Sequence, residues 1–376
     1  MRKLDDIREE IDSVDAEMVS LYEKRMDLAE QVAEYKISTG KKVLDKEREK
    51  SKLEKIKALA TTEFTKCGVT ELFEQIMAMS RKRQYQMLTE HGIIEKSEFM
   101  PVDRITGEQK RIVCQGAEGS NTEAAMKAFF GEGVDGFHVE NWRDAMEAIK
   151  KEEADYAVLP IENSSAGIVS QNYDLLMEYD CCIVGEQIIK IDHCLLGMPD
   201  AELSDITQVY SHPQGLMQCA GFLEEHRNWE SISTKNTAMA AKKIKEDGKK
   251  NQAAIASRIT ADIYGLKILR ENVQDDSNNS TRFIIVSKKK MYVKDAKKIS
   301  ICFEIPHESG SLYHTLSHFI YNNLNMDHIE SRPIKGRNWE YRFFIDFVGN
   351  LEDSAVQNAL RGLKEETVKL KILGNY

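Results

Sequence analysis

The stretch IREEIDSVDAEMVSLYEKRMDLAEQVAEYK, residues 7–36, decides the fold of the N-terminal part of the chain. Its apolar side chains recur at alternating spacings of four and three residues, which predicts a helix that packs against partner helices. They are Ile7, Ile11, Val14, Met18, Leu21, Leu28, Val32 and Tyr35. Arg25 occupies the missing position of this seam. A buried cation needs an anion, so we expect either a carboxylate on another helix or an anionic ligand inside the bundle.

Further polar residues are predicted on the inner faces of the same bundle. Lys36 lies eleven residues beyond Arg25, about three helical turns, and so points to nearly the same side. Two more sets share single faces of the next two predicted helices: Asp45, Arg48 and Glu49, and then Ser80 and Gln84. Three cations thus face a small set of polar groups in a bundle that otherwise requires apolar residues.

Length and composition restrict the class of protein. The 376 residues predict two or three domains, and the formal net charge of −10, without a long basic run, argues against nucleic-acid binding. The charged start is not typical of a signal peptide, and no apolar stretch approaches the roughly 18 residues of a membrane span. The seven cysteines are scattered without metal-like spacing. We therefore expect a cytoplasmic protein that has reduced thiols and does not enter a membrane.

The composition and apolar periodicity of the sequence change along the chain. Residues 1–92 predict an all-α domain, and a polar linker over 93–110 follows it. Over 111–288, short apolar runs alternate with helical patterns, which indicates an α/β domain. The expected strands include RIVCQG, DYAVLP, CCIVGEQ, TQVYSH, QAAIAS and TRFIIVS. After a second charged linker, residues 297–376 predict the order βαββαβ of an α+β ferredoxin-like unit.

Polar motifs follow several predicted strands of the α/β domain, which is where open α/β sheets place ligands. They are LPIENSSAG with Asn163 and Ser164, YSHPQG with Ser211 and Gln214, the helix start at Thr237, and NNSTRF with Thr281 and Arg282. The glycine-rich QGAEGSNTEAA follows the first strand, at a helix start whose amide groups can bind anions. Taken singly, each motif also fits a plain turn or a helix cap.

The helical part resembles the all-α chorismate mutase domain through residues 7–36, VLDKERE and LFEQIMAMSRKRQ. The matching positions are Arg8, Arg25, Lys36, Asp45, Arg48, Glu49, Ser80 and Gln84. The resemblance implies that Lys36 and Gln84 address the breaking ether oxygen of chorismate and that Glu49 binds its ring hydroxyl. Guanidinium groups suit the two carboxylates of this substrate. Because the rearrangement is pericyclic, the site has to hold the reactive conformer and needs no nucleophile.

The position of Arg8 along the first helix bears on whether two copies of the chain share one site. It lies 17 residues before Arg25, which is roughly 25 Å along a helix. A ligand of the size of chorismate cannot contact both side chains on one straight helix. If both serve one site, Arg8 comes from a second copy of the chain, which predicts a domain-swapped helical dimer; otherwise Arg8 is a solvated surface residue. The resemblance implies the same dimer.

The α/β domain is similar to prephenate dehydratase, most specifically in LPIENSSAG, IDHCLL, YSHPQ and NNSTRF. The resemblance implies two α/β lobes, like those of periplasmic solute-binding proteins, with prephenate bound between them. It makes Thr281 the group that assists the leaving hydroxyl and Arg282 a carboxylate ligand. The remaining lining is expected from Asn163, Ser164, Ser211, Gln214 and Thr237. Asn121 departs from the family, which has an aromatic residue in the first loop.

The C-terminal unit resembles the ACT regulatory domain through ESGSLYHTL and HIESRPIKGRNWEYRFFIDF. The resemblance implies that phenylalanine binds between paired domains and inhibits the enzyme. The expected contacts are Gly310, Ser311, Leu312, Glu330, Ser331 and Arg332, with Ser311 in place of the usual alanine. The alternative is a domain that only mediates dimerisation.

The expected protein is therefore a bifunctional enzyme of phenylalanine biosynthesis that acts on chorismate and prephenate as a homodimer or larger homo-oligomer. We expect no metal and no cofactor, because no metal cluster or nucleotide-binding loop is visible. One alternative is a non-catalytic amino-acid sensor or solute-binding protein, which would have no reason to keep Thr281 or the polar residues of the bundle. The other is an enzyme that takes arogenate in place of prephenate.

Overall fold

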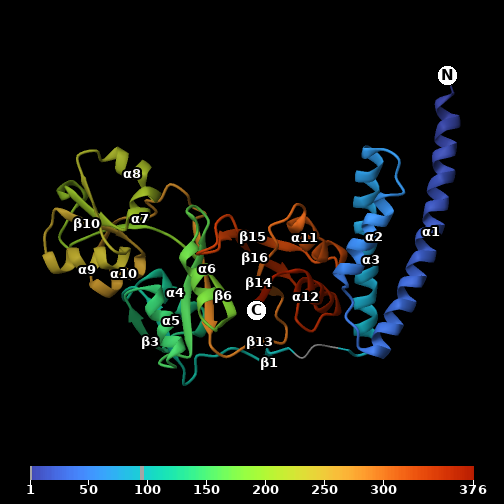
Figure 1. Cartoon of the computed structure of the whole chain (residues 1–376). Coiled ribbons are helices and arrows are strands. Elements are labelled where there is room, and N and C mark those ends of the chain that lie inside the picture. The colour runs from blue at the N-terminus through green and yellow to red at the C-terminus, as the bar shows by residue number, and fades with distance from the viewer. Residues whose placement is uncertain (1, 94–96) are drawn as a thin grey trace. The chain divides into compact units, whose positions relative to one another are not determined.

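Figure 1 presents the chain as a computed structural model, which describes residues 2–93 and 97–376. The chain forms two compact units. The first joins residues 1–97 to 297–371, and the second comprises 98–296 and 372–376. The helical and C-terminal parts, predicted as separate domains, thus fold into one unit.

Three helices form the N-terminal part of the first unit: α1 (Leu4–Thr39), α2 (Lys46–Lys57) and α3 (Glu63–Glu90). Gly40 ends α1 in the left-handed conformation, Asp45 caps α2, and Thr62 caps α3. The C-terminal half of α1 packs along α3, while the predicted apolar seam from Ile7 to Leu21 is exposed in the single chain. The predicted all-α domain is therefore present, and its first helix keeps an unburied apolar face.

The C-terminal part of the first unit has the predicted βαββαβ order. Its elements are β14 (Lys298–Glu304), α11 (Ser311–Tyr321), β15 (Met326–Pro333), β16 (Tyr341–Val348), α12 (Ser354–Glu366) and the start of β17 (Lys369–Asn375), whose residues from 372 onward belong to the second unit. The strands lie in the order β15-β16-β14-β17, and β16 pairs antiparallel with both β14 and β15. Helix α12 packs on α3, so this part covers one side of the helical part.

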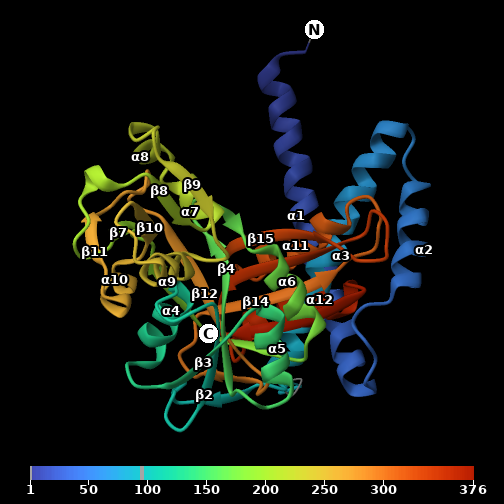
Figure 2. The same ribbon diagram turned by 90° about the vertical axis from the view of Figure 1, so that its left-hand side faces the viewer.

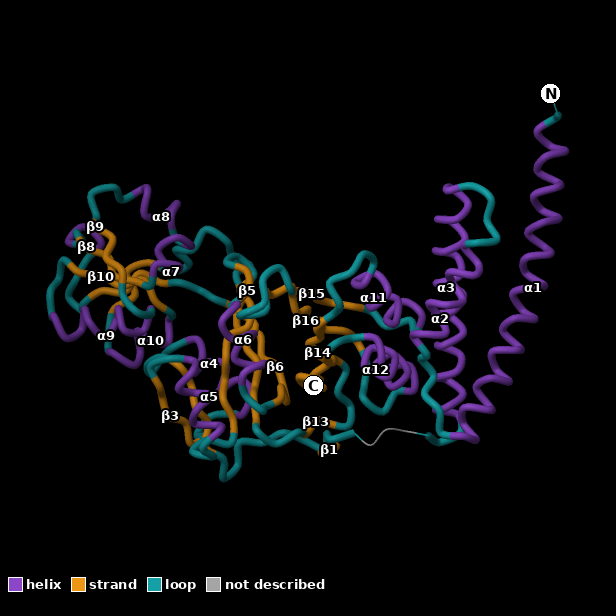
Figure 3. The backbone as a smooth tube through the Cα atoms, in the orientation of Figure 1, coloured by secondary structure: helices purple, strands orange, loops and turns teal. Residues whose placement is uncertain are grey.

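The second unit contains two large sheets, which the ribbon in Figure 2 and the tube in Figure 3 display, besides the two-stranded sheet of β1 and β13 described below. The first has the order β6-β12-β4-β2-β3, with β5 on β4, and the second has the order β11-β7-β10-β8-β9. The chain crosses from one to the other after β6 and returns after β11. Two lobes of this kind are what the sequence predicts.

The strands of the first lobe are β2 (Arg111–Gln115), β3 (Asp135–Val139), β4 (Tyr156–Asn163), β5 (Gly167–Ile168), β6 (Cys182–Lys190) and β12 (Ser280–Ser287). Its helices are α4 (Asn121–Phe130), α5 (Trp142–Lys150) and α6 (Ser170–Glu178). Strand β12 runs between β4 and β6 and is antiparallel to both. This central position fixes Thr281 at the end of a fully paired strand.

The second lobe has the strands β7 (Cys194–Gly197), β8 (Gln208–Ser211), β9 (Glu230–Ser233), β10 (Gln252–Ala256) and β11 (Lys267–Arg270). Its helices are α7 (Pro213–Gln218), α8 (Ala220–Glu225), α9 (Thr237–Asp247) and α10 (Arg258–Tyr264), with one turn of 3₁₀ helix at Leu203–Asp205. Every residue of β10 is buried, as a continuous apolar run predicts for a central strand. Its two faces contribute to separate apolar clusters above and below the sheet.

The segment predicted as a linker over 93–110 is partly structured. Residues 94–96 lie outside the described residues. Beyond them, β1 (Met100–Val102) pairs in parallel with β13 (Met291–Val293), so both predicted linkers contribute a strand to the second unit. Among the described residues, no helix is both long and apolar enough to cross a bilayer.

Candidate active sites

Two cations of the helical part meet the two buried polar residues predicted to face them. The Arg25 guanidinium donates to Ser80 Oγ at 2.5 Å, and Lys36 Nζ donates to Gln84 Oε1 at 3.0 Å. Ser80 and Gln84 are buried on α3, one helical turn apart. Lys36 also donates to the Val43 carbonyl at 2.5 Å. The sequence predicts Arg25 and Lys36 on one face of α1 and Ser80 and Gln84 on one face of α3. The structure brings these two faces together.

The charges of this group are only partly neutralised. Burial lowers the pKa of Lys36, and the nearby Arg48 cation lowers it further, while Glu49 and Asp45 act in the opposite direction. Burial also lowers the pKa of Arg25. A group of half-buried cations with depressed pKa values favours binding of an anion, because an anionic ligand restores the solvation that the cations have lost.

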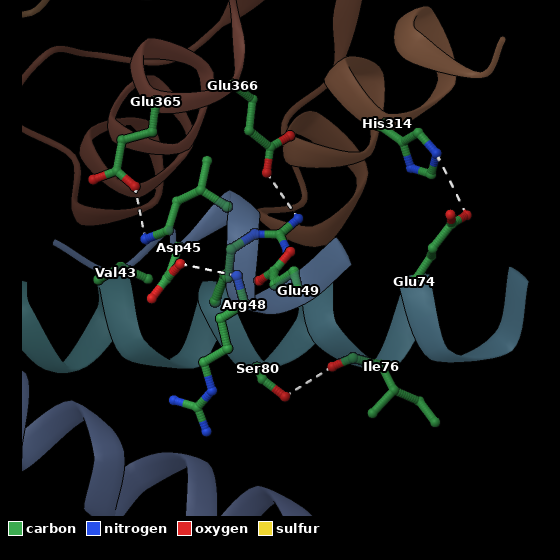
Figure 4. A network of polar contacts seen from close by, with 12 residues as sticks. Val43, Asp45, Arg48, Glu49, Glu74, Ile76, Ser80, His314, Glu365 and Glu366 are labelled. Atoms are coloured by element: carbon green, nitrogen blue, oxygen red, sulfur yellow. Dashed lines mark hydrogen bonds and ion pairs between the residues drawn. The ribbon is translucent and has the colours of Figure 1, made fainter. Parts of the chain in front are cut away.

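The residues predicted on α2 have different surroundings. Asp45 caps the helix, because its Oδ1 accepts from the Arg48 amide at 3.0 Å. Glu49 is held by Arg81, whose Nη1 donates to Glu49 Oε2 at 2.6 Å. Figure 4 shows Asp45 and Glu49 above Ser80 on α3, whereas the side chain of Arg48 extends down past Ser80. Asp45 thus has a structural role besides any contact with a ligand.

Arg8 does not join this group. It is exposed on α1, and its closest described partner is Asp5 at 3.5 Å. Arg8 and Arg25 lie on one continuous helix, as the sequence argument assumes. One copy of the chain therefore leaves the predicted arginine set incomplete.

Thr281 and Asn163 form the centre of the site in the second unit. They face each other across β12 and β4, and Asn163 Nδ2 lies 2.9 Å from Thr281 Oγ1. The amides of Ser165 and Ala166 approach the other end of the Asn163 side chain at 3.2 and 2.9 Å. Backbone N–H groups only donate, so that end is the oxygen and the NH₂ faces Thr281. Thr281 consequently accepts from Asn163, and its own proton is left to donate elsewhere.

Residues of the second lobe extend this network. Gln218 on α7 donates to Asn163 Oδ1 at 3.3 Å and to Ser165 Oγ at 3.1 Å, and Gln214 Nε2 lies 3.5 Å from Asn163 Oδ1. Gln218 Oε1 lies 3.0 Å from the imidazole of His193. Burial lowers the pKa of His193, which favours the neutral ring that donates to Gln218. Both lobes thus position the Asn163 amide.

Arg282 lies on the opposite face of β12 from Thr281, because neighbouring residues of a strand alternate between faces. It pairs in register with Glu162, and its guanidinium lies 3.9 Å from Glu162 and 3.6 Å from Glu186. The structure therefore places the predicted carboxylate ligand beside two carboxylates and away from the threonine.

The other predicted lining residues divide into two kinds. Ser211 is fully buried, and its hydroxyl donates to the Ile255 carbonyl at 2.7 Å, so it supports the second sheet. Ser164 is exposed, and its amide and hydroxyl both bond to the backbone of Ser280, beside Thr281. Thr237 is partly exposed as the first residue of α9, next to Gly215 on α7. Gln214, Ser164 and Thr237 remain accessible, whereas Ser211 does not.

The predicted effector residues of the C-terminal part are not all brought together in one chain. Gly310, Ser311 and Leu312 line a pocket of about 210 Å³ that also includes Glu308, Glu340 and Tyr341. Gly310 has a φ of 80°, which favours glycine, and starts α11. Glu330, Ser331 and Arg332 lie on β15 and do not line this pocket.

Known families match both catalytic parts. The family of type II chorismate mutases matches residues 7–85, and the prephenate dehydratase family matches residues 112–291. The bifunctional chorismate mutase/prephenate dehydratase of Escherichia coli K12 is 32% identical over 377 residues, which covers 98% of this chain and 95% of that protein. The chain belongs to the bifunctional chorismate mutase/prephenate dehydratase family.

Two further similarities each cover 71% of this chain. A chloroplastic arogenate dehydratase/prephenate dehydratase of Arabidopsis thaliana is 40% identical over 283 residues, 71% of each chain. The crystal structure of a prephenate dehydratase from Arthrobacter aurescens in complex with L-phenylalanine is 32% identical, with a TM-score of 0.66. It covers 71% of this chain and 89% of that one. The family predicted from the sequence motifs is confirmed.

Three residues around the two sites were missed in the sequence. Arg81 holds Glu49 of the mutase domain, and Gln218 and Asn279 contact the Asn163 side chain of the dehydratase domain. Burial alone would lower the pKa of Arg81, but Glu366 and Glu49 outweigh it and raise the pKa. Two signals were available in the sequence: Arg81 follows Ser80 on the third helix, and Asn279 lies inside the motif NNSTRF. Gln218 carried no signal beyond its polarity.

Proposed function

We infer that this chain rearranges chorismate to prephenate in its helical domain and converts prephenate to phenylpyruvate in its α/β domain. Family membership supports both activities and a place in phenylalanine biosynthesis. The observation that carries the assignment is that two independent polar clusters, one at Arg25, Lys36 and Gln84 and one at Asn163 and Thr281, have the groups that these two reactions need.

In the mutase site, Arg25 and Arg48 bind the carboxylates of chorismate. Lys36 and Gln84 address the ether oxygen on which negative charge develops in the transition state. The Gln84 oxygen accepts from Lys36, so its NH₂ group is the end that can donate to the ligand. Glu49 accepts from the ring hydroxyl. Fixed donors of this kind accelerate a pericyclic reaction by selecting the reactive conformer and stabilising charge.

The mutase site is shared between two chains, with Arg8 supplied by the partner. The exposed apolar seam of α1 supports this proposal, because Ile11, Val14 and Leu21 would be buried against a second copy. The length of α1, 36 residues, places Arg8 too far from Arg25 for both to contact one ligand within a chain.

In the dehydratase site, Thr281 donates a hydrogen bond to the ring hydroxyl of prephenate as it leaves. The bond between the ring and its carboxylate breaks, its electron pair enters the ring, and the hydroxyl departs as water after taking up a proton. The products are phenylpyruvate, carbon dioxide and water. Because Asn163 donates to Thr281, the threonine proton is directed to the substrate. Aromatisation supplies the driving force, so a weak donor suffices.

The C-terminal domain is a phenylalanine sensor that lowers dehydratase activity. The pocket at Gly310–Leu312 forms one half of the phenylalanine-binding site. The L-phenylalanine complex of the related Arthrobacter enzyme supports this assignment. Glu330, Ser331 and Arg332 would complete the site from the C-terminal domain of a second chain. A feedback ligand acts by binding one conformation better than another.

The test is to incubate the pure protein with chorismate and to measure prephenate and phenylpyruvate with and without phenylalanine. Appearance of both products, with phenylpyruvate formation slowed by phenylalanine, supports the proposal. Comparing kcat/KM for prephenate and arogenate decides the substrate of the second step, which the similarity to the Arabidopsis protein leaves open. A chain that binds these acids without turnover would instead be a sensor.

A further inference from the structure

Arg81 links a carboxylate of the mutase domain to one of the C-terminal domain. Its Nη1 donates to Glu49 Oε2 at 2.6 Å, and its Nη2 lies 2.8 Å from Glu366 Oε1 at the end of α12. The Arg81 side chain is only 11% exposed, and that of Glu366 only 14%. A planar guanidinium that contacts two carboxylates through two nitrogens is fixed in orientation. The position of Glu49 therefore depends on Glu366.

Glu366 is itself held on its other oxygen. His318 Nε2 of α11 lies 2.9 Å from Glu366 Oε2, and the imidazole packs against Gly362, where a Cβ atom would collide with the ring. The carboxylate is thus fixed between Arg81 and His318. Figure 4 shows Glu366 descending from α12 toward the helices that carry Glu49 and Ser80.

The neighbouring Glu365 supports the other end of the same site. Its Oε2 accepts from the Leu44 amide at 3.0 Å and from the Tyr85 hydroxyl at 2.7 Å. Leu44 lies between Val43, whose carbonyl accepts from Lys36, and Asp45, which caps α2. The last turn of α12 therefore contacts both the start of α2 and the arginine that holds Glu49.

Sharing of the Arg81 charge also matters for Glu49. With one carboxylate, the guanidinium would form a closed pair and neutralise Glu49. With two, each carboxylate keeps part of its negative charge and its capacity to accept a further hydrogen bond. Arg81 therefore orients Glu49 without neutralising it, so Glu49 can still accept a hydrogen bond from a hydroxyl of the ligand.

We propose that Glu366 of the C-terminal domain is a positioning residue of the mutase site, which acts through Arg81 on Glu49. The proposal rests on the assignment of Glu49 as a ligand of chorismate. It adds that the domain assigned to phenylalanine sensing also completes the geometry of the mutase domain of its own chain.

The test measures mutase kinetics of Glu366→Gln in the full-length chain, with dehydration of added prephenate as the internal control of folding. Loss of one charge-assisted contact predicts a fall in mutase kcat/KM of about 10-fold, mainly through KM, because Glu49 contributes binding. Dehydratase activity should match the wild type. Unchanged mutase KM and kcat in this variant would overturn the proposal.

Glu74→Gln is the matched control, because it removes another contact between α3 and α11, that of Glu74 with His314 at 3.7 Å, without touching Arg81. It should keep wild-type mutase kinetics; an equal loss would assign the effect to docking of the two parts and reject positioning. The double variant Arg81→Gln/Glu366→Gln should be no worse than Arg81→Gln alone, because Glu366 acts through Arg81. Additive losses would contradict that route.

If Glu366→Gln fails to fold, Arg81→Lys replaces it, since one ammonium cannot reproduce the two-armed contact. A raised mutase KM in this variant supports the proposal, and a wild-type KM rejects it. A wild-type chain that does not turn over chorismate would instead reject the mutase assignment itself, so the two failures are distinguishable.

Discussion

At the residue scale, the hydroxyl of Thr281 is the group on which the dehydratase step depends. Thr281→Ala should lower phenylpyruvate formation from prephenate by about 100-fold or more, in the range of a removed acid catalyst. Thr281→Ser keeps the hydroxyl and should retain part of the activity. Mutase activity, measured on the same samples, should be unaffected in both variants. Full dehydratase activity of the alanine variant would exclude this role.

Asn163 orients that hydroxyl, and an isosteric change tests the direction of the hydrogen bond. Asn163→Asp replaces the donating NH₂ group by an acceptor, so the Thr281 proton should turn toward the carboxylate and away from the substrate. We expect kcat of the dehydratase to fall at least about 10-fold with Thr281 intact. Asn163→Ala, which leaves the hydroxyl free to rotate, should be the less damaged variant. The opposite ranking would contradict an Asn163 amide that donates to Thr281.

The lowered pKa of Lys36 gives the mutase a pH dependence. Because burial and Arg48 disfavour the ammonium, Lys36 loses its proton below its ordinary pKa of 10.5 as the pH rises. Mutase kcat/KM, which reports the free enzyme, should therefore fall at a pH below that value. In Lys36→Arg, the remaining activity should persist to higher pH, since a guanidinium stays charged. If kcat/KM falls at the same alkaline pH in both proteins, a group other than Lys36 causes the fall.

At the scale of elements, α1 is long enough to contribute side chains to both mutase sites of a dimer. Neither Arg8→Ala nor Arg25→Ala homodimers should form prephenate at an appreciable rate, because each site lacks one arginine. Mixed dimers refolded from both variants contain one site with both substitutions and one with neither, so mutase activity should reappear. Measuring prephenate formation across mixing ratios checks this. Folded mixed dimers that stay inactive would reject the shared site.

Most elements could be predicted because their periodicity reflects burial directly. The apolar runs of β4, β10 and β12 appear as buried strands where the sequence places them. The helix predicted from the seam of α1 also forms, although most of that seam is exposed in the single chain. The alternation of side chains along β12 also predicts that Thr281 and Arg282 face opposite sides of the sheet, because neighbouring residues of a strand point to opposite faces. The contact of Arg81 with Glu366 could not be predicted, because the run SRKRQ has the composition of a solvated helix face and Glu366 lies 285 residues further along.

At the scale of the whole molecule, the helical and C-terminal parts form one compact unit, although they are separated by the entire dehydratase domain in sequence. Arg361 of α12 donates to the carbonyls of Tyr85 and Ile93, and Asn358 accepts from Thr89. A truncation that removes the C-terminal part would therefore expose the buried face of α3 that carries Tyr85. Point variants in the full-length chain are the appropriate test of regulation.

Phenylalanine should inhibit the dehydratase through the pocket at the start of α11. At Gly310, a Cβ would lie 3.2 Å from His314 Nε2, and the φ of 80° is strained for alanine, so Gly310→Ala should distort the pocket wall. Gly336→Ala is the matched control, because Gly336 also has a positive φ of 84° but its Cβ would meet open space outside the pocket. Calorimetry should show weaker phenylalanine binding in the first variant than in the second.

The kinetic readout is the ratio of dehydratase rates with and without phenylalanine, which removes any common effect on the basal rate. This ratio should approach one in Gly310→Ala and in Arg332→Ala and should remain at its wild-type value in Gly336→Ala. Because a coupling free energy is reciprocal between sites, prephenate should in turn weaken phenylalanine binding in the wild type and in Gly336→Ala. If phenylalanine competes directly with prephenate and both Gly310→Ala and Arg332→Ala keep full inhibition, the effector binds in the dehydratase domain. The C-terminal domain then has only the structural role of supporting α3 and Glu49.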